Sequence, residues 1–182
     1  MQPFRILVRG LDNLANSEHY LFTSADLHAL LPELSSATFK TLLSRAVSNN
    51  LLVRISRGLY FYPRVDYPRG LLLFHAAARL RADTFNYISL ETVLSDEGVI
   101  SQVPINRITL MSAGRTHVIH CGDFGTIEFV HTNRLPSVIE NQLIYDAACH
   151  LWRASVPLAL RDMRATRRSL DLVDWGVANE FI

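Results

Sequence analysis

Four residues that lie near one another in the sequence, His117, His120, Cys121 and His131, carry side chains that could together bind a metal ion. On a regular strand His117 and Cys121 would share a face but lie ~13 Å apart, at ~3.3 Å per residue, and His117 and His120 would point to opposite faces. The spacing also lacks the C-x-x-C and helical H-x-x-x-H patterns of zinc sites. We therefore interpret these residues as ordinary members of a sheet, and expect neither a metal nor a cofactor.

Three carboxylates near the predicted strands, Glu91, Asp123 and Glu128, could instead bind magnesium in a nuclease site. Such a site usually needs a lysine close to the second carboxylate, where it stabilises developing charge. The only lysine of the chain, Lys40, is distant in the sequence. We place Asp123 in the turn Gly122–Gly125 and Glu128 on a solvated strand face. A nuclease is therefore the least favoured alternative.

Other catalytic patterns are absent from the sequence, which has no glycine-rich phosphate loop, nucleophile elbow or Cys-His nucleophile pattern. Asp171 and Asp174 fit a helix surface, where they would pair with Arg167 and Arg168 at spacings of three and four. We predict that the protein is not an enzyme.

The segment 22–63 fits another chemistry, the recognition of nucleic acid. One side of a predicted helix is small, polar and basic, and small side chains near a helix start allow close approach to a duplex. First-turn amides and the cationic side chains suit phosphate groups or guanine edges. This side consists of Ser36, Ala37, Lys40, Thr41, Ser44 and Arg45.

Capping residues and the spacing of apolar residues predict two helices, of which this helix is the second. Thr23 with Asp26 is a capping-box pattern that starts a first helix, from about Ser24 to Leu31. Ser35 or Ser36 can cap the second helix. Its apolar residues recur at spacings of three and four and predict one buried stripe, made of Phe39, Leu42, Leu43, Ala46 and Val47.

A hairpin is predicted after the two helices. Leu52–Ser56 and Leu59–Tyr62 have strand patterns and are joined through Arg57-Gly58, where glycine tolerates the positive φ of a two-residue turn. Helix, turn, helix and hairpin in this order form a winged helix-turn-helix. Arg54, Arg57 and Arg64 lie on the wing, where a phosphate backbone or a minor groove is their natural target. A protein-binding module of the same architecture remains the alternative.

The 182 residues predict an α+β protein of two domains, 1–66 and 67–182, because prolines at 63 and 68 punctuate the end of the wing. A helix is expected before the first domain's helix-turn-helix, at 2–16. The second domain should have helices at 69–81, 89–98, 137–154 and 161–179. Its strands at 105–111, 116–121 and 126–132 should form a small antiparallel meander. Arg79 and Arg81 are interpreted as a solvated helix end.

Composition favours a folded cytoplasmic protein. Hydrophobic residues make up 49% of the chain and charged residues 19%. The N-terminus lacks the pattern of a secretory signal, and no run approaches the ~18 apolar residues that cross a bilayer. Cys121 and Cys149 alone do not make a disulfide framework.

Four segments together resemble the AbiEi-type antitoxins of type IV toxin-antitoxin, or abortive infection, systems. They are FTSADLHALL, LLVRISRGLYFYP, YISLETVLSDEGVISQVP and GDFGTIEFVHT, which span Phe22 to about Thr132. The second carries the wing signature R-x-x-R-G-x-Y. The third matches the family pattern YxSxExxLxxxGxI at Tyr87, Ser89, Glu91, Leu94, Gly98 and Ile100.

The resemblance implies a winged helix that binds inverted repeats in its own promoter and represses transcription. The second domain would counteract a nucleotidyltransferase-like toxin without a stable complex, and the protein would be a monomer or weak dimer without membrane contact. The resemblance assigns Ser36, Thr38, Lys40, Thr41 and Arg45 to the recognition helix and Arg54 and Arg57 to the wing. Residues 67–182 carry eleven Arg against twelve acidic residues, which argues against DNA contacts by that domain.

Overall fold

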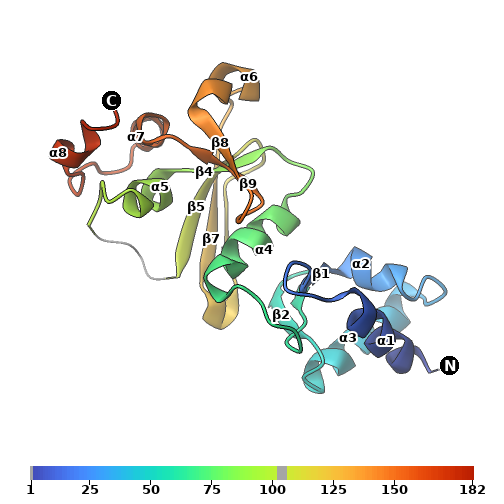
Figure 1. Cartoon of the computed structure of the whole chain (residues 1–182). Coiled ribbons are helices and arrows are strands. Elements are labelled where there is room, and N and C mark those ends of the chain that lie inside the picture. The colour runs from blue at the N-terminus through green and yellow to red at the C-terminus, as the bar shows by residue number, and fades with distance from the viewer. Residues whose placement is uncertain (1, 102–105) are drawn as a thin grey trace. The chain divides into compact units, whose positions relative to one another are not determined.

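The computed structural model describes residues 2–101 and 106–182. Its contacts divide the chain into two compact units, Met1–Leu72 and Leu73–Ile182, whereas the sequence suggested a division between residues 66 and 67. Each unit combines helices with a sheet, so the predicted α+β class is confirmed (Figure 1). Within the described residues, no helix has the length and apolar character needed to cross a membrane.

The first unit has the order of elements that the sequence predicted, with one added strand. Its elements are α1 (Pro3–Leu14), β1 (Leu21–Thr23), α2 (Ser24–Ala29), α3 (Ser36–Ser48), β2 (Val53–Ser56), β3 (Leu59–Phe61) and the 3-10 turn η1 (Arg69–Leu71). The unpredicted strand is β1, which pairs with β3 and makes the wing hairpin part of a three-stranded antiparallel sheet in the order β1-β3-β2.

Two capped helix starts set the geometry of the helix-turn-helix. The Thr23 amide donates to Asp26 Oδ2 at 2.7 Å and the Asp26 amide donates to Thr23 Oγ1 at 3.1 Å, so the predicted capping box is confirmed. Ser35 caps α3, because its Oγ accepts from the Thr38 amide at 3.2 Å. Both helices bury apolar residues in one core with α1, including Leu7, Leu27 and the predicted stripe of α3, of which only Val47 is partly buried.

The second unit is built on a six-stranded sheet. Its elements are α4 (Leu72–Leu80), β4 (Asn86–Ile88), α5 (Leu90–Asp96), β5 (Arg107–Ser112), β6 (His117–His120), η2 (Gly122–Phe124), β7 (Thr126–His131), α6 (Pro136–Ile139), η3 (Glu140–Gln142), β8 (Leu143–Asp146), β9 (Leu151–Ala154), α7 (Val156–Ala165) and α8 (Trp175–Ala178). The strand order is β6-β7-β5-β4-β9-β8.

The predicted antiparallel meander is wrong in its order. The hairpin of β6 and β7 is antiparallel, but β7 returns beside β5 in the parallel sense, and β6 lies at the edge of the sheet. The tight turn Gly122–Gly125 explains the hairpin, since Gly122 and Gly125 both have positive φ. The glycines of the sequence predicted the positions of the turns, but they did not predict which strands would pair with each other. Ile105, predicted to start a strand, lies outside the described residues.

The predicted helix at 137–154 is also wrong. Only the short helix α6 forms, with Pro136 in its first turn and no side-chain cap from Leu135 at its start, and the chain then forms the antiparallel strands β8 and β9. Because β9 pairs in parallel with the buried strand β4, long-range strand pairing overrides the local helical spacing.

The predicted helix at 161–179 is replaced by two helices. Pro157 stands in the first turn of α7, where its missing amide hydrogen costs no hydrogen bond. Arg167, with φ of 56°, follows the end of α7. Asp171 accepts from the Ser169 hydroxyl and Asp174 caps α8, so neither forms the predicted pair with Arg167 or Arg168.

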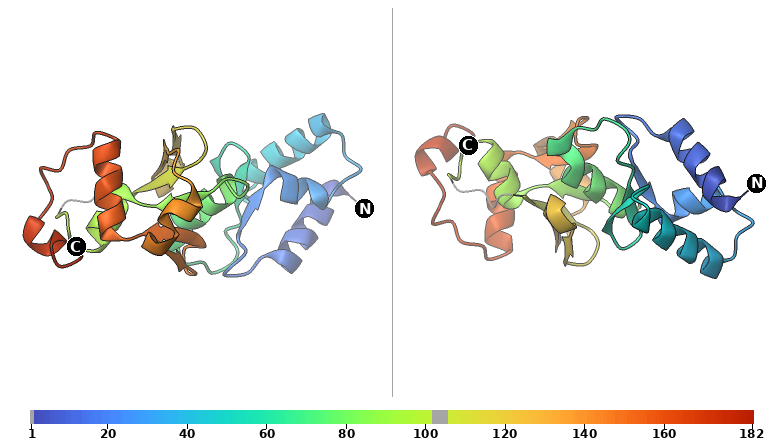
Figure 2. Two further views of the ribbon diagram at one scale, coloured as in Figure 1. Left: turned by 90° about the horizontal axis from the view of Figure 1, so that it is seen from above. Right: turned by 90° about the horizontal axis from the view of Figure 1, so that it is seen from below.

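Helices cover both faces of the larger sheet. Side chains of neighbouring residues on a strand point to opposite faces. On one face of β7, Glu128 contacts Arg168, which follows α7 and also forms an ion pair with Glu91 of α5. On the other face, Phe129 contacts Arg81, which follows α4. Helices α5 and α7 therefore share one face, as Figure 2 shows in both views, and α4 covers the other.

Candidate nucleic-acid interface

Helix α3 presents its small and polar side to solvent. Phe39, Leu42, Leu43 and Ala46 are buried, while residues 36–38, 40–41, 44–45 and 48 are exposed. The Thr41 hydroxyl donates to the Ala37 carbonyl at 3.1 Å and the Ser48 hydroxyl donates to the Ser44 carbonyl at 3.0 Å. These local bonds keep the side chains close to the helix, so that the exposed strip has a low profile.

The wing places its residues by strand register. Arg54 of β2 is directly opposite Tyr60 of β3, and cross-strand partners in an antiparallel pair point to the same face. A register shift between Arg54 and Ser56 precedes the turn, where Gly58 has φ of 77°. The predicted glycine turn is thus present, and it leaves the Arg57 side chain exposed at the tip.

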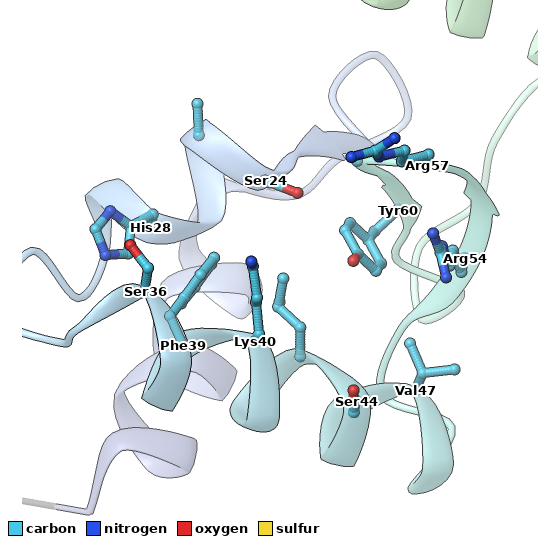
Figure 3. Close-up of a pocket in the computed structure, with 13 residues that line it drawn as sticks. Ser24, His28, Ser36, Phe39, Lys40, Ser44, Val47, Arg54, Arg57 and Tyr60 are labelled. Carbon is cyan, nitrogen blue, oxygen red and sulfur yellow. The ribbon is translucent and has the colours of Figure 1, made fainter.

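A pocket of about 750 Å³ lies between α3, α2 and the wing (Figure 3). Four of the seven predicted site residues line it: Ser36 and Lys40 from α3, and Arg54 and Arg57 from the wing. The described lining residues include these three cations and His28, but no carboxylate. Phe39, Leu43, Val47 and Tyr60 supply its apolar surface. The arrangement favours an anionic ligand that also offers apolar surface.

The other three predicted residues, Thr38, Thr41 and Arg45, line a separate hollow of about 580 Å³ that includes the start of α1. The guanidinium of Arg45 lies over the Phe4 ring, 5.4 Å from its centroid, in a cation–π contact. The Thr38 hydroxyl is 2.9 Å from Ser35 Oγ, beside the helix cap. The predicted site residues therefore lie on two flanks of α3 rather than in one cluster.

Four polar residues that line the pocket were not among the predicted site residues: Ser24, His28, Ser44 and Tyr60. Tyr60 had a signal in the sequence, because it ends the wing signature R-x-x-R-G-x-Y, and all four signature residues line the pocket. His28 had no such signal in the sequence. Its Nε2 lies 3.0 Å from the Leu34 carbonyl and its ring packs against Phe39, and both contacts depend on the turn between α2 and α3.

In the second unit, the polar residues of the family pattern are structural. Tyr87 and Ser89 donate hydrogen bonds to the fully buried Asp162 of α7, at 3.1 and 2.7 Å, and Arg134 Nε lies 3.4 Å from the same carboxylate. Burial raises the pKa of Asp162 and outweighs these hydrogen bonds. Glu91 forms an ion pair with Arg168 at 2.7 Å. The pattern YxSxE thus fixes β4 and α5 against the C-terminal part of the unit.

Glu128 is not on a solvated face, as predicted, but is buried between two arginines. Arg107 Nη2 and Arg168 Nη2 lie 2.6 and 2.5 Å from its carboxylate. Burial alone would raise the pKa of Glu128, but the hydrogen bonds from the two guanidinium groups outweigh it and hold the pKa below its usual value. Asp123 is exposed in the turn that was predicted for it.

The prediction for Arg81 is also wrong, because this residue is not a solvated helix end. Its guanidinium lies 4.0 Å from the centroid of the Phe129 ring and donates to Ser112 Oγ at 2.7 Å and to the Arg115 carbonyl at 2.6 Å. Burial lowers its pKa. Arg81 therefore anchors the end of α4 to the sheet.

The histidine and cysteine residues of the sheet do not gather. His131 contacts the Gly114 carbonyl and Asn133, and His120 contacts Thr126. Among the described residues no three of the His, Cys, Asp or Glu side chains form a group that could hold a metal ion. Cys121 and Cys149 are free and buried, and burial raises the pKa of each to about 11.

Residues 11–63 match the family described as "Transcriptional regulator, AbiEi antitoxin". The predicted resemblance is thereby confirmed for the winged helix-turn-helix, while the two matching stretches of the second unit lie beyond the matched residues. The AbiEi-type segment runs from α1 to the end of the wing and contains every residue that lines the larger pocket. The family's description names a regulator of transcription and not an enzyme.

A solved structure shows the same fold. The crystal structure of the RV2827C protein from Mycobacterium tuberculosis superimposes with a TM-score of 0.58 at 14% sequence identity, covering 93% of this chain and 64% of that one. The chain thus spans a little under two thirds of the length of this structure. No curated protein matches the chain.

Proposed function

We propose that this protein is the antitoxin of a type IV toxin-antitoxin system and binds its own promoter DNA through the winged helix to repress transcription. One observation carries this proposal: within the AbiEi-type segment, Lys40, Arg54 and Arg57 surround a pocket beside an exposed, small-residue helix face, and no carboxylate is among the described residues that line this pocket. Cations without neighbouring anions are the electrostatic footprint of a phosphate-binding surface.

The geometry supports one docking arrangement. The low strip of α3 around Ala37, Thr41 and Ser44 enters the major groove, since small side chains allow the helix to approach the base edges. The wing then contacts the adjacent backbone through Arg54 and Arg57. Thr38 and Arg45 face the opposite flank of α3, where they meet the backbone on the other side of the groove.

The proposal is tested by measuring the affinity for the duplex upstream of the protein's own reading frame over a range of salt concentrations. Each phosphate that loses a cationic partner lowers the salt slope by about 0.9. Replacing Arg54 and Arg57 by Ala should therefore lower it by about two and weaken binding to any sequence. Arg167→Gln, a charge change at an exposed residue of the second unit, is the control and should leave binding unchanged.

The binding function would be abandoned if the wild-type protein failed to shift this duplex. Capture of a stable protein complex by a chain that binds no duplex would favour the alternative, a winged-helix module for protein contacts.

The antitoxin function is assigned to the second unit, which counteracts a nucleotidyltransferase-like toxin in the cytoplasm without a stable complex. A monomer or weak dimer suffices for this role, and inverted repeats would bring two copies together on DNA. The full chain should rescue growth of cells that express the toxin encoded beside it. The Arg54→Ala, Arg57→Ala variant should rescue growth equally when expressed from an unrelated promoter, because its second unit is intact. Loss of rescue would contradict this division of roles.

A further inference from the structure

Tyr60 is the most enclosed polar residue of the larger pocket. Its side chain belongs to the core of the first unit and only 9% of the residue is exposed. Figure 3 shows the ring extending from β3 toward α3, with the hydroxyl in the space between the two elements. Among the described residues the hydroxyl has no hydrogen-bond partner, although it is not shut off from solvent. A ligand in the pocket would thus find a fixed donor at its base.

The chemistry of the pocket selects the ligand. Lys40 offers three N–H donors and each arginine five, and none of these groups can accept a hydrogen bond. The tyrosine hydroxyl adds a donor held in place by the packing of its ring. Phe39 and Val47 line the walls beside these donors. A group that fits has more than one oxygen that shares negative charge and is flanked by apolar surface, as the two non-bridging oxygens of a phosphodiester between two deoxyriboses are.

We propose that this pocket seats one backbone phosphodiester of the bound duplex, with the Tyr60 hydroxyl donating to a phosphate oxygen that Lys40 and an arginine of the wing also contact. This inference rests on the proposed DNA-binding function and makes Tyr60 a positioning residue for the strand that crosses between α3 and the wing. All four residues of the wing signature R-x-x-R-G-x-Y then contribute to one contact. Gly58 forms the turn of the hairpin, and Arg54, Arg57 and Tyr60 face the same stretch of DNA backbone.

Tyr60→Phe tests the inference, because it removes the hydroxyl and keeps the ring in the core. Loss of a hydrogen bond to a charged group should weaken binding to the promoter duplex about tenfold. The salt slope should stay unchanged, since no charge is lost. Lys40→Gln should instead lower the slope by about one. Tyr67→Phe, the same deletion on a tyrosine outside the pocket that packs against Tyr20 and Phe61, is the matched control and should bind as the wild type does.

A scan of the duplex with neutral methylphosphonate groups locates the phosphate. One position should weaken wild-type binding and have little further effect on Tyr60→Phe, because the contact is already lost. If the wild type binds the duplex and Tyr60→Phe binds equally well, the inference fails and the proposed function stands. If the wild type does not bind, the proposed function itself fails.

Free phosphate is the other source of this chemistry. Inorganic phosphate at constant ionic strength should not displace the duplex from the wild type, because a single phosphate lacks the flanking sugars. Displacement that Tyr60→Phe abolishes would overturn the assignment to the backbone and identify the pocket as a site for a free phosphorylated ligand.

Discussion

Glu128 shows how a charged residue can be mistaken at the scale of single side chains. The alternation of side chains along a strand assigns residues to two faces of the sheet, but it does not show which face is covered by helices. Here α5 and α7 cover the face that holds Glu128. Its carboxylate bridges Arg107 and Arg168, and Arg168 continues to Glu91. These partners lie up to 77 residues apart in the sequence, so no local pattern could predict the network.

Acid should weaken the fold through Glu128. The pKa of this carboxyl is lower in the folded than in the unfolded chain, so the unfolded chain binds more protons as the pH falls through the ordinary range of a glutamate. The stabilisation is present at neutral pH and lost as the pH falls through the folded-state pKa. Glu128→Gln should cost about 2 kcal/mol at neutral pH, because a buried carboxylate loses its ion pairs with the exposed Arg107 and the half-buried Arg168, and should flatten the acid limb of the stability profile.

Urea unfolding at a series of pH values measures both effects. Asp123→Asn makes the same change of charge at an exposed turn and should leave the profile unchanged. An acid limb that persists in Glu128→Gln would show that another carboxylate is responsible.

At the scale of elements, the first unit follows its local signals and the second does not. Caps at Thr23 and Ser35 and the turn at Gly58 lie within a few residues of the elements they define, so spacing alone located both helices and the hairpin. In the second unit β9 pairs with β4 across more than sixty residues, and this pairing turned a predicted helix into strands. Sequence reasoning could predict only part of the pocket. It could assign the charged residues to the helix and the wing, but only the strand register shows that Tyr60 lies on the same face as Arg54.

The turn between β6 and β7 offers a sharp test of backbone strain. A Cβ atom at Gly125 would lie 2.0 Å from the Asn106 carbonyl oxygen, and its φ of 120° is a conformation that glycine alone adopts readily. Gly125→Ala should therefore destabilise the protein by about 3 kcal/mol or prevent folding. Gly122→Ala, at φ of 56° with open space around the Cβ position, should cost only about 1 kcal/mol. Thermal unfolding compares the two, and equal losses would contradict the clash.

At the scale of the whole molecule, the two units differ in net charge and each has a core of its own. Residues 1–72 carry eight basic and five acidic residues, a net charge of +3, while residues 73–182 carry ten and twelve, a net charge of −2. The total of +1 therefore hides a cationic unit that bears the proposed DNA contacts. Each unit has its own sheet and its own buried residues.

Damage to one core should remain in that unit. Leu27 is fully buried in the core of the first unit, so Leu27→Ala should destabilise this unit by about 2–5 kcal/mol and abolish duplex binding. Both tryptophans, Trp152 and Trp175, belong to the second unit. The thermal midpoint followed by tryptophan fluorescence should therefore stay at the wild-type value while helical circular dichroism reveals an earlier transition. A common shift of both signals would show that the units unfold together.

The enclosed thiols of Cys121 and Cys149 make the chain convenient for site-directed labelling. Because both are buried and their pKa values lie near 11, very little thiolate forms at neutral pH for an alkylating reagent to attack. A third cysteine, introduced at the exposed Ala37 of α3, would react far faster than the native pair. A nitroxide or dye attached there would report immersion of the helix in a groove while the native sulfur atoms stay in place.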